Sequence, residues 1–179
     1  MVMGASGRAC RANDDVEEHS RARIVSVART AALNMDEFLQ IAIREAEQGL
    51  REGGIPIGAV LVHDGKVLGQ GHNRRVQRGS AILHAEMDAL ENAGRQKADV
   101  YARCVMYTTL SPCVMCAGAI LLYGIRQVVV GENQTFLGEE DLLRSRGCEI
   151  HVVQDPTCVD LMRSFIRDRP ELWNEDIGR

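Results

Sequence analysis

The chain has 179 residues, which suits one domain of ordinary size that buries a core without disulfide support. It is 45% hydrophobic and 26% charged, as in ordinary soluble globular proteins, and no apolar run approaches the roughly 20 residues that a membrane span needs. The formal net charge of -4 lacks the basic excess that phosphate backbones favour. This composition argues against a membrane or nucleic-acid partner and favours a small-molecule ligand.

The cysteines and the N-terminus together favour a location inside the cell. No continuous apolar core follows a basic start, so a signal peptide is not expected. Without a secretory signal, reduced thiols or metal ligands are better interpretations of cysteines than disulfides. We therefore expect a cytoplasmic protein that is also present in the nucleus. The six cysteines are Cys10, Cys104, Cys113, Cys116, Cys148 and Cys158.

Residues 1–34 differ from the rest of the chain. Their small residues, scattered arginines and acidic residues show no sustained periodicity, so we expect a disordered extension. The arginines raise the possibility of a transit peptide, but such peptides are poor in acidic residues, and this segment carries Asp14, Asp15, Glu17 and Glu18. One domain is expected over residues 35–179.

The first elements of this domain are a helix and a hairpin. Asp36 can cap a helix whose apolar residues recur at helical spacing up to Leu50, and Gly53-Gly54 should end it. The apolar, partly β-branched run of residues 55–62 predicts a buried strand. An Asp-Gly turn within residues 63–66 then predicts a hairpin to a second strand over residues 67–72.

The rest of the chain alternates helices and strands. A loop over residues 73–80 carries three arginines, and an acidic tail over residues 170–179 carries the only tryptophan. Alternating strands and helices indicate an α/β domain with helices packed on a sheet, to which the hairpin adds an antiparallel pair. The expected elements are helices over 84–93, 113–123, 138–146 and 158–167, and strands over 104–109, 127–130 and 149–153.

Two short motifs carry the chemistry. His84-Ala85-Glu86 and Pro112-Cys113-Val114-Met115-Cys116 match the zinc deaminase signature, H-x-E followed by P-C-x-x-C. Catalytic zinc takes three nitrogen or sulfur ligands from the protein and leaves its fourth position to water. The candidate ligands are His84, Cys113 and Cys116, and the two thiols lie at an expected helix start that favours thiolate.

Glu86 stands two residues beyond the histidine, which places it beside the metal without making it a ligand. Zinc lowers the pKa of its bound water toward neutrality, and Glu86 would move that proton first to a ring nitrogen and then to a leaving amine. We therefore predict that Glu86 is the catalytic acid and base.

Each half of the signature, taken alone, fits a second interpretation. The pair Cys113 and Cys116 could belong to a structural zinc site or a redox pair, and His84 could be an ordinary helix histidine. A structural site has four protein ligands, and no second cysteine pair lies nearby. Both halves in order, with Glu86 in place, favour the catalytic interpretation.

With these motifs the chain resembles the cytidine and deoxycytidylate deaminase superfamily and, within it, the fungal cytosine deaminases. The resemblance covers about residues 35–179. Besides the two motifs it rests on residues 52–58 (EGGIPIG), 71–73 (GHN), 130–133 (VGEN) and 173–178 (WNEDIG). It implies a three-layer α/β/α sandwich with a central mixed sheet of about five strands, a homodimer, and one catalytic zinc ion per subunit.

The resemblance also implies an activity and a substrate pocket. The activity is hydrolysis of free cytosine, and of 5-substituted cytosines such as 5-fluorocytosine, to uracil and ammonia in pyrimidine salvage. Asn73 would bind the polar edge of the pyrimidine, and Asp176 would accept from its exocyclic amine. The other residues expected to face the base are Ile55, Ala85, Ser111, Phe136 and Trp173.

Several of these pocket residues also suit a purely structural role, and one departs from the pattern. Asn73 also suits a turn, Asp176 a solvated tail, Trp173 a tail anchor and Phe136 the core. Ala85 stands where the fungal enzymes commonly have glycine, and tRNA adenosine deaminases share this alanine.

Three further functions therefore stay open. A tRNA adenosine deaminase would need a basic channel, for which Arg74, Arg75 and Arg78 are candidates. Such a cluster is more often a solvated loop face, and the acidic tail and the net charge disfavour an RNA substrate. A guanine or nucleoside deaminase would use the same zinc chemistry. A catalytically silent subunit would commonly lack Glu86, which is present.

Overall fold

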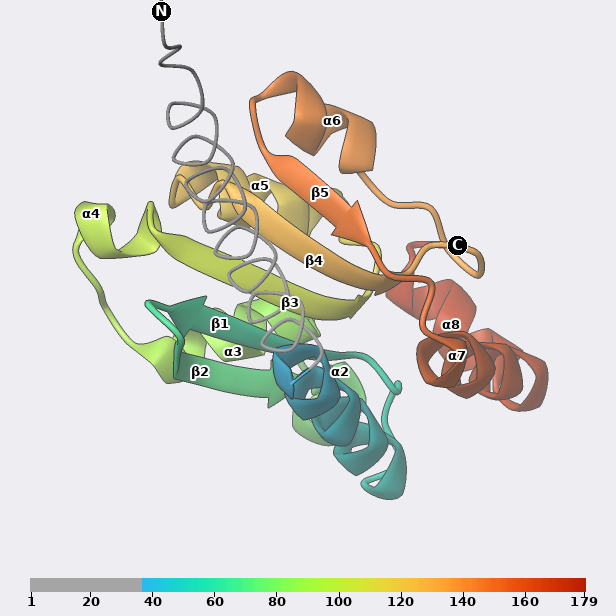
Figure 1. The fold of residues 1–179 in the computed structure, drawn as a ribbon. Helices are drawn as coiled ribbons and strands as arrows, with labels where there is room; N and C mark the ends of the chain where they lie inside the picture. The colour runs from blue at the N-terminus through green and yellow to red at the C-terminus, as the bar shows by residue number, and fades with distance from the viewer. Residues whose placement is uncertain (1–36) are drawn as a thin grey trace, which may run out of the picture. The chain divides into compact units, whose positions relative to one another are not determined.

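Five strands form a single mixed sheet in a computed structural model that describes residues 37–179 (Figure 1). The strand order is β2-β1-β3-β4-β5; β1 runs antiparallel to both of its neighbours, and β3, β4 and β5 are parallel. The expected extension of residues 1–34 and the cap at Asp36 lie outside the described residues. The strands are β1 (Gly58–His63), β2 (Lys66–His72), β3 (Cys104–Leu110), β4 (Gln127–Glu132) and β5 (Glu149–Val152).

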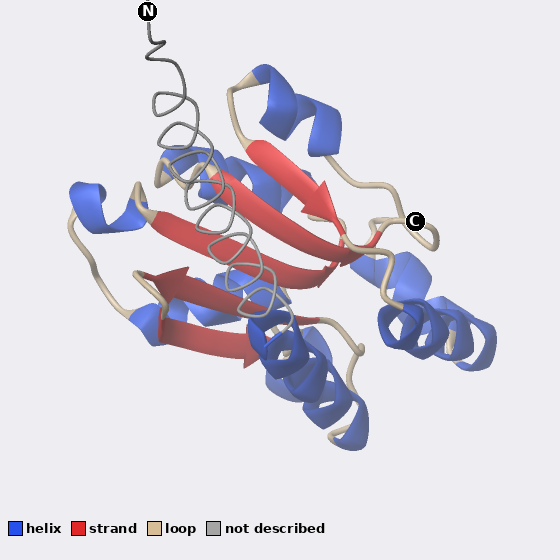
Figure 2. Ribbon diagram, viewed as in Figure 1, coloured by secondary structure: helices blue, strands red, loops and turns tan. Residues whose placement is uncertain are grey.

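Helices cover both faces of the sheet, which confirms the expected α/β/α sandwich (Figure 2). The helices α3 (Ala85–Ala93) and α5 (Val114–Leu122) lie on one face, and the helix of residues 37–51 and α7 (Pro156–Asp168) lie on the other. Shorter helices complete the described chain: α2 (Arg75–Arg78), α4 (Ala98–Tyr101), α6 (Glu140–Ser145) and α8 (Pro170–Asp176).

Glycine permits the turn and the close packing that the hairpin requires. Asp64 and Gly65 both have positive φ, 48° and 72°, as the Asp-Gly pair predicts for a two-residue hairpin turn. A Cβ at Gly58 would collide with the backbone of the helix over residues 37–51, and one at Gly69 would collide with the backbone of α3. The two strands therefore lie tightly between helices on opposite faces.

Several element boundaries differ from the sequence predictions. The strand expected from Ile55 begins only at Gly58, because Pro56 has no N–H to donate and Ile57 N instead donates to Ile55 O at 2.8 Å. The acidic tail forms α8, which has Pro170 at its first position. The loop over residues 73–80 contains the single turn α2, and α4 was not expected.

The core lies mainly between the sheet and the layer of α3 and α5. Leu61, Met106 and Val128 point to this layer from three neighbouring strands and are buried together with Ile120 of α5. Burying one such side chain contributes about 1.5–3 kcal/mol. Among residues 37–179, no helix combines the length and the apolar character of a bilayer-crossing segment.

A candidate metal centre under the C-terminal helix

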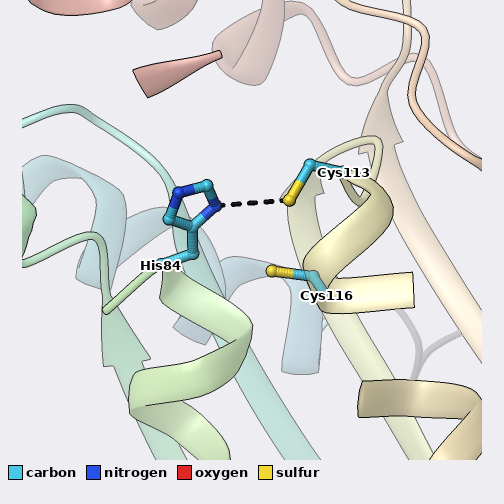
Figure 3. A group of neighbouring side chains, drawn as sticks. All are labelled: His84, Cys113 and Cys116. Carbon is cyan, nitrogen blue, oxygen red and sulfur yellow. Dashed lines mark hydrogen bonds between the residues drawn. The ribbon is translucent and has the colours of Figure 1, made fainter. Parts of the chain in front are cut away.

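The two halves of the motif meet where α3 and α5 begin. His84 is the N-cap of α3, Cys113 is the N-cap of α5, and Cys116 lies in the first turn of α5. One ligand atom from each residue lies within 4.8 Å of the other two, and His84 Nδ1 is 3.4 Å from Cys113 Sγ (Figure 3). Two helix N-termini therefore converge on one point.

The donor set and spacing fit zinc. A tetrahedral site with Zn–N near 2.0 Å and Zn–S near 2.3 Å places nitrogen and sulfur about 3.5 Å apart, close to the observed separation of His84 and Cys113. One imidazole and two thiols are the ligands that zinc prefers, and the positive ends of the two helix dipoles favour thiolate. Three protein ligands leave a fourth position free, as in catalytic sites.

Cys113 is prepared to act as a thiolate. A hydrogen bond from the Cys116 thiol and a second contact with His84 lower the pKa of Cys113 to about 4, against the opposing effect of burial. A thiol with so low a pKa is ionised at neutral pH, which is the form that binds metal.

Glu86 lies beside the three ligands in the first turn of α3. Its side chain is 4% exposed, and Oε1 accepts a hydrogen bond of 3.0 Å from Thr108 Oγ1. Burial, and then the charge of Cys113, raise the pKa of Glu86, whereas a zinc ion would act in the opposite sense. A buried carboxyl with a raised pKa is suited to accepting and releasing a proton near neutral pH.

A small cavity adjoins Glu86, His84 and Cys113. Four of the residues predicted to contact a substrate line this cavity: Ser111, Phe136, Trp173 and Asp176. The rings of Phe136 and Trp173 meet edge to face with their centroids 5.7 Å apart, and form part of its wall. The helix α8 thus brings the acidic tail over the predicted catalytic residues.

Asn73 lies directly behind Asp176. It is fully buried, its Nδ2 donates to Asp176 Oδ1 at 2.9 Å, and its Oδ1 accepts from the backbone N–H of Arg75 at 3.1 Å. Asn73 therefore makes the turn contact that its residue type suggests and also positions the acidic side chain.

Ile55 and Ala85 are fully buried and do not line the cavity. Ile55 belongs to the core, and Ala85 is the first residue of α3. From the same segment as Ile55 it is Ile57 that lines the cavity, because the backbone turns at Pro56.

Several residues around the cavity were not predicted from the sequence. Leu110 and Ile177 complete its apolar wall, and Thr108 holds Glu86. The strand alternation of β3 could have placed Thr108 on the side facing α3, two residues from buried Met106. The hydroxyl of Ser111 bonds to the protein itself, since it donates to Glu140 at 2.9 Å.

Two of the three loop arginines are paired with acids. Arg74 Nε is 3.1 Å from Asp88 Oδ2, and Arg75 contacts both Glu175 and Asp176 of α8. These contacts favour an internal role for this loop over a free basic surface.

Comparison with known proteins places these features in a family. A model of the cytidine and deoxycytidylate deaminase zinc-binding region matches residues 33–132. A cytosine deaminase of Candida albicans is 57% identical over 141 residues, which cover 78% of this chain and 94% of that protein.

More distant relatives are named for a different activity. A tRNA-specific adenosine deaminase of Streptococcus pyogenes is 38% identical over 144 residues, covering 75% of this chain and 91% of that protein. A solved structure from a study of A-to-I editing by tRNA:A34 deaminases has a TM-score of 0.60 and 26% identity, covering 70% of this chain and 99% of that one. The fold, the His-Cys-Cys cluster and these matches agree, so the chain belongs to the zinc-binding cytidine and deoxycytidylate deaminase family.

Proposed function

We propose that the protein is a zinc-dependent cytosine deaminase that hydrolyses free cytosine, and 5-substituted cytosines such as 5-fluorocytosine, to uracil and ammonia in pyrimidine salvage. The observation that carries this proposal is the position of Asp176, which lines the cavity beside Glu86 and is held there by Asn73. A carboxylate in that position suits an exocyclic amine, and the high identity to the Candida albicans enzyme supports a pyrimidine base.

His84, Cys113 and Cys116 hold one catalytic zinc ion per subunit. Bound there, zinc supplies a Lewis acid that lowers the pKa of water and activates it as the nucleophile. Thr108 Oγ1, which is within hydrogen-bond distance of both Glu86 Oε1 and Leu110 O, orients the carboxyl group that carries the proton of this water. Glu86 takes this proton, delivers it to the ring nitrogen of the base, and later protonates the departing amine.

The remaining predicted residues orient the base. Asp176 accepts from the exocyclic amine, and the second N–H of Asn73 Nδ2 donates to the polar edge of the pyrimidine. Phe136 and Trp173 together form an aromatic wall beside the planar ring, and Ser111 adds a polar wall. Ile55 and the backbone at Ala85 support this pocket from behind.

The position of α8 over the cavity favours a free base over a nucleoside as the substrate. Trp173, Asp176 and Ile177 lie over the cavity, and the space beside them is small. A ribose attached to the base would have to displace this helix.

The test is ammonia release by the zinc-loaded protein with cytosine, cytidine, adenine, guanine and an adenosine-containing tRNA anticodon stem-loop in parallel. We expect turnover of cytosine alone among these compounds. Turnover of the stem-loop in place of cytosine would contradict the proposal and would leave the zinc chemistry in place.

The tRNA adenosine deaminase activity is the second candidate, because Ala85 and the Streptococcus pyogenes relative favour it. An RNA substrate needs a basic channel to a flipped base. Arg74 and Arg75 are instead engaged by carboxylates, which makes cytosine the better-supported substrate.

We also propose that the protein is a homodimer of the cytoplasm and the nucleus. Apolar side chains at the outer end of α5 support association, since Leu122 is 79% exposed and Tyr123 is 40% exposed. Sedimentation of a Leu122→Glu variant tests this, because a charge in the interface should yield monomers. The five described cysteines are all unpaired, which suits a reducing compartment.

A further inference from the structure

Arg75 connects α2 to two adjacent carboxylates of the C-terminal helix. Its Nη1 donates to Oδ1 of Asp176 at 3.1 Å, and its Nη2 donates to Oε1 of Glu175 at 3.4 Å. About a hundred residues separate these partners in the sequence. Because α2 contains no buried residue, apolar packing contributes little to this contact.

The inner of the two contacts is the stronger one. The side chain of Asp176 is 3% exposed and that of Arg75 is 16% exposed, whereas Glu175 is 68% exposed. Exposed pairs contribute little, but removing one partner of a buried pair leaves an uncompensated charge. The planar fork of arginine allows one guanidinium to meet both carboxylates, which a lysine cannot do.

The contact also helps to hold the carboxylate of Asp176 beside the candidate metal ligands. Oδ1 accepts from Asn73 Nδ2 and from Arg75 Nη1, and it lies 3.6 Å from His84 Nε2. No residue within 37–179 donates a hydrogen bond to Oδ2. The carboxylate is thus held by one oxygen, while its side chain lines the cavity.

We infer that Arg75 is a positioning residue that holds α8 over the cavity and fixes the carboxylate of Asp176 at the cavity wall. The inference rests on the proposed function only in taking the exocyclic amine of the base as the group that Asp176 meets. When the contacts of Arg75 with Glu175 and Asp176 are lost, α8 opens more often and the base binds more weakly.

A single tryptophan on α8 allows the opening of this helix to be measured. Trp173 is the only tryptophan of the chain, lies on α8, lines the cavity, and is 6% exposed. Quenching of its fluorescence by acrylamide therefore measures how often α8 opens, whatever the substrate is.

The experiment compares full-length, zinc-loaded Arg75→Gln with the wild type. We expect at least a twofold rise in the acrylamide quenching constant of Trp173, a rise in KM for cytosine of about tenfold with a smaller change in kcat, and unchanged zinc content. Arg75→Lys keeps the charge but loses the planar fork, so we expect a quenching constant and a KM between those of the wild type and Arg75→Gln. This variant also provides a test if Arg75→Gln does not fold.

Arg78→Gln is the matched control, because Arg78 lies on the same short helix, is exposed, and forms no ion pair with α8. Its quenching constant and its KM should equal those of the wild type. A wild-type quenching constant and a wild-type KM in Arg75→Gln would contradict the proposed positioning role of Arg75. If the wild type does not turn over cytosine, the proposed function fails, and the quenching comparison alone still decides the role of Arg75.

Discussion

The side chains of Asn73 and Asp176 are joined by a hydrogen bond of 2.9 Å although 103 residues separate them in the sequence. Asn73 directly follows β2, and Asp176 is the last residue of α8. The acidic side chain at the cavity is therefore held by a residue from a distant part of the chain. By contrast, the zinc-binding cluster uses only residues from the beginnings of α3 and α5.

This division of the site predicts the effect of removing the tail. Deletion of residues 170–179 should lower cytosine turnover by about 10²-fold or more, since Asp176 and Trp173 no longer position the base. Zinc content should not change, because the three ligands lie elsewhere. Ammonia release and metal analysis of the same preparation check both statements. Equal turnover in the truncated protein would refute the assigned roles of the tail.

Replacing the buried carboxylate should separate catalysis from metal binding. Glu86→Gln keeps the shape of the side chain and its hydrogen bond from Thr108 but cannot carry a proton. We expect kcat to fall by roughly 10²- to 10⁴-fold, with zinc still bound. Full activity in this variant, measured against an active wild type, is incompatible with the mechanism.

A milder substitution, at Thr108, tests the hydrogen bond that the Glu86 carboxylate accepts. Thr108→Val preserves volume and removes the hydroxyl that donates to Glu86 at 3.0 Å. A hydrogen bond to a charged group contributes about 1.5–3 kcal/mol, so we expect kcat to fall about tenfold or more. The nearby Thr109 donates no bond to Glu86 and bonds the Gly58 N–H instead, so Thr109→Val is the matched control. Equal kcat values for the two variants would remove Thr108 from the mechanism.

A pH effect on stability is expected at His72, which precedes Asn73. Its ring nitrogens contact Glu45 at 2.8 Å and Glu52 at 2.9 Å, and the hydrogen bond with Glu45 is the main cause that raises the pKa of His72. The same bond lowers the pKa of Glu45, while bonds from Gln48 and then His72 lower the pKa of Glu52 to about 2.

The direction of this pH effect follows from the difference between the pKa values of the folded and unfolded states. A base with a raised pKa stabilises the fold fully below its unfolded value of 6.5 and loses that contribution as the pH rises through its folded pKa. The two carboxylates contribute fully above their unfolded value of 4.5 and lose that contribution as the pH falls through their lowered folded-state pKa values. The free energy of unfolding lost in His72→Gln, measured with urea, should therefore be largest near pH 5.5 and smaller at pH 9. His151→Gln, at an exposed site, is the control. A loss at His72 that is independent of pH would contradict this prediction.

The sequence alone predicted two features that depend on residues close together in the chain. Asp64-Gly65 specifies its hairpin turn, and the spacing within the cysteine motif places both thiols at one helix start. The helical state of the tail was missed, although Pro170 is a typical first residue of a helix.

Long-range contacts could not be predicted from the sequence. The arginine-rich loop was expected to be a solvated face, with an RNA surface as the alternative, because no residue near Arg75 in the sequence indicates its partners about a hundred residues away. Likewise, Ile57 lines the cavity and Ile55 does not, because the backbone turns at Pro56. The apolar run of residues 55–62 gives no indication of this turn.

All three candidate metal ligands stand at the beginnings of two helices that pack on the same face of the sheet. An ion bound there acts as a cross-link between α3 and α5, so binding and folding share one free energy. The melting temperature of this protein should rise with free zinc concentration, by an amount set by the affinity of the site. A thermal melt would then serve as a titration of the metal centre.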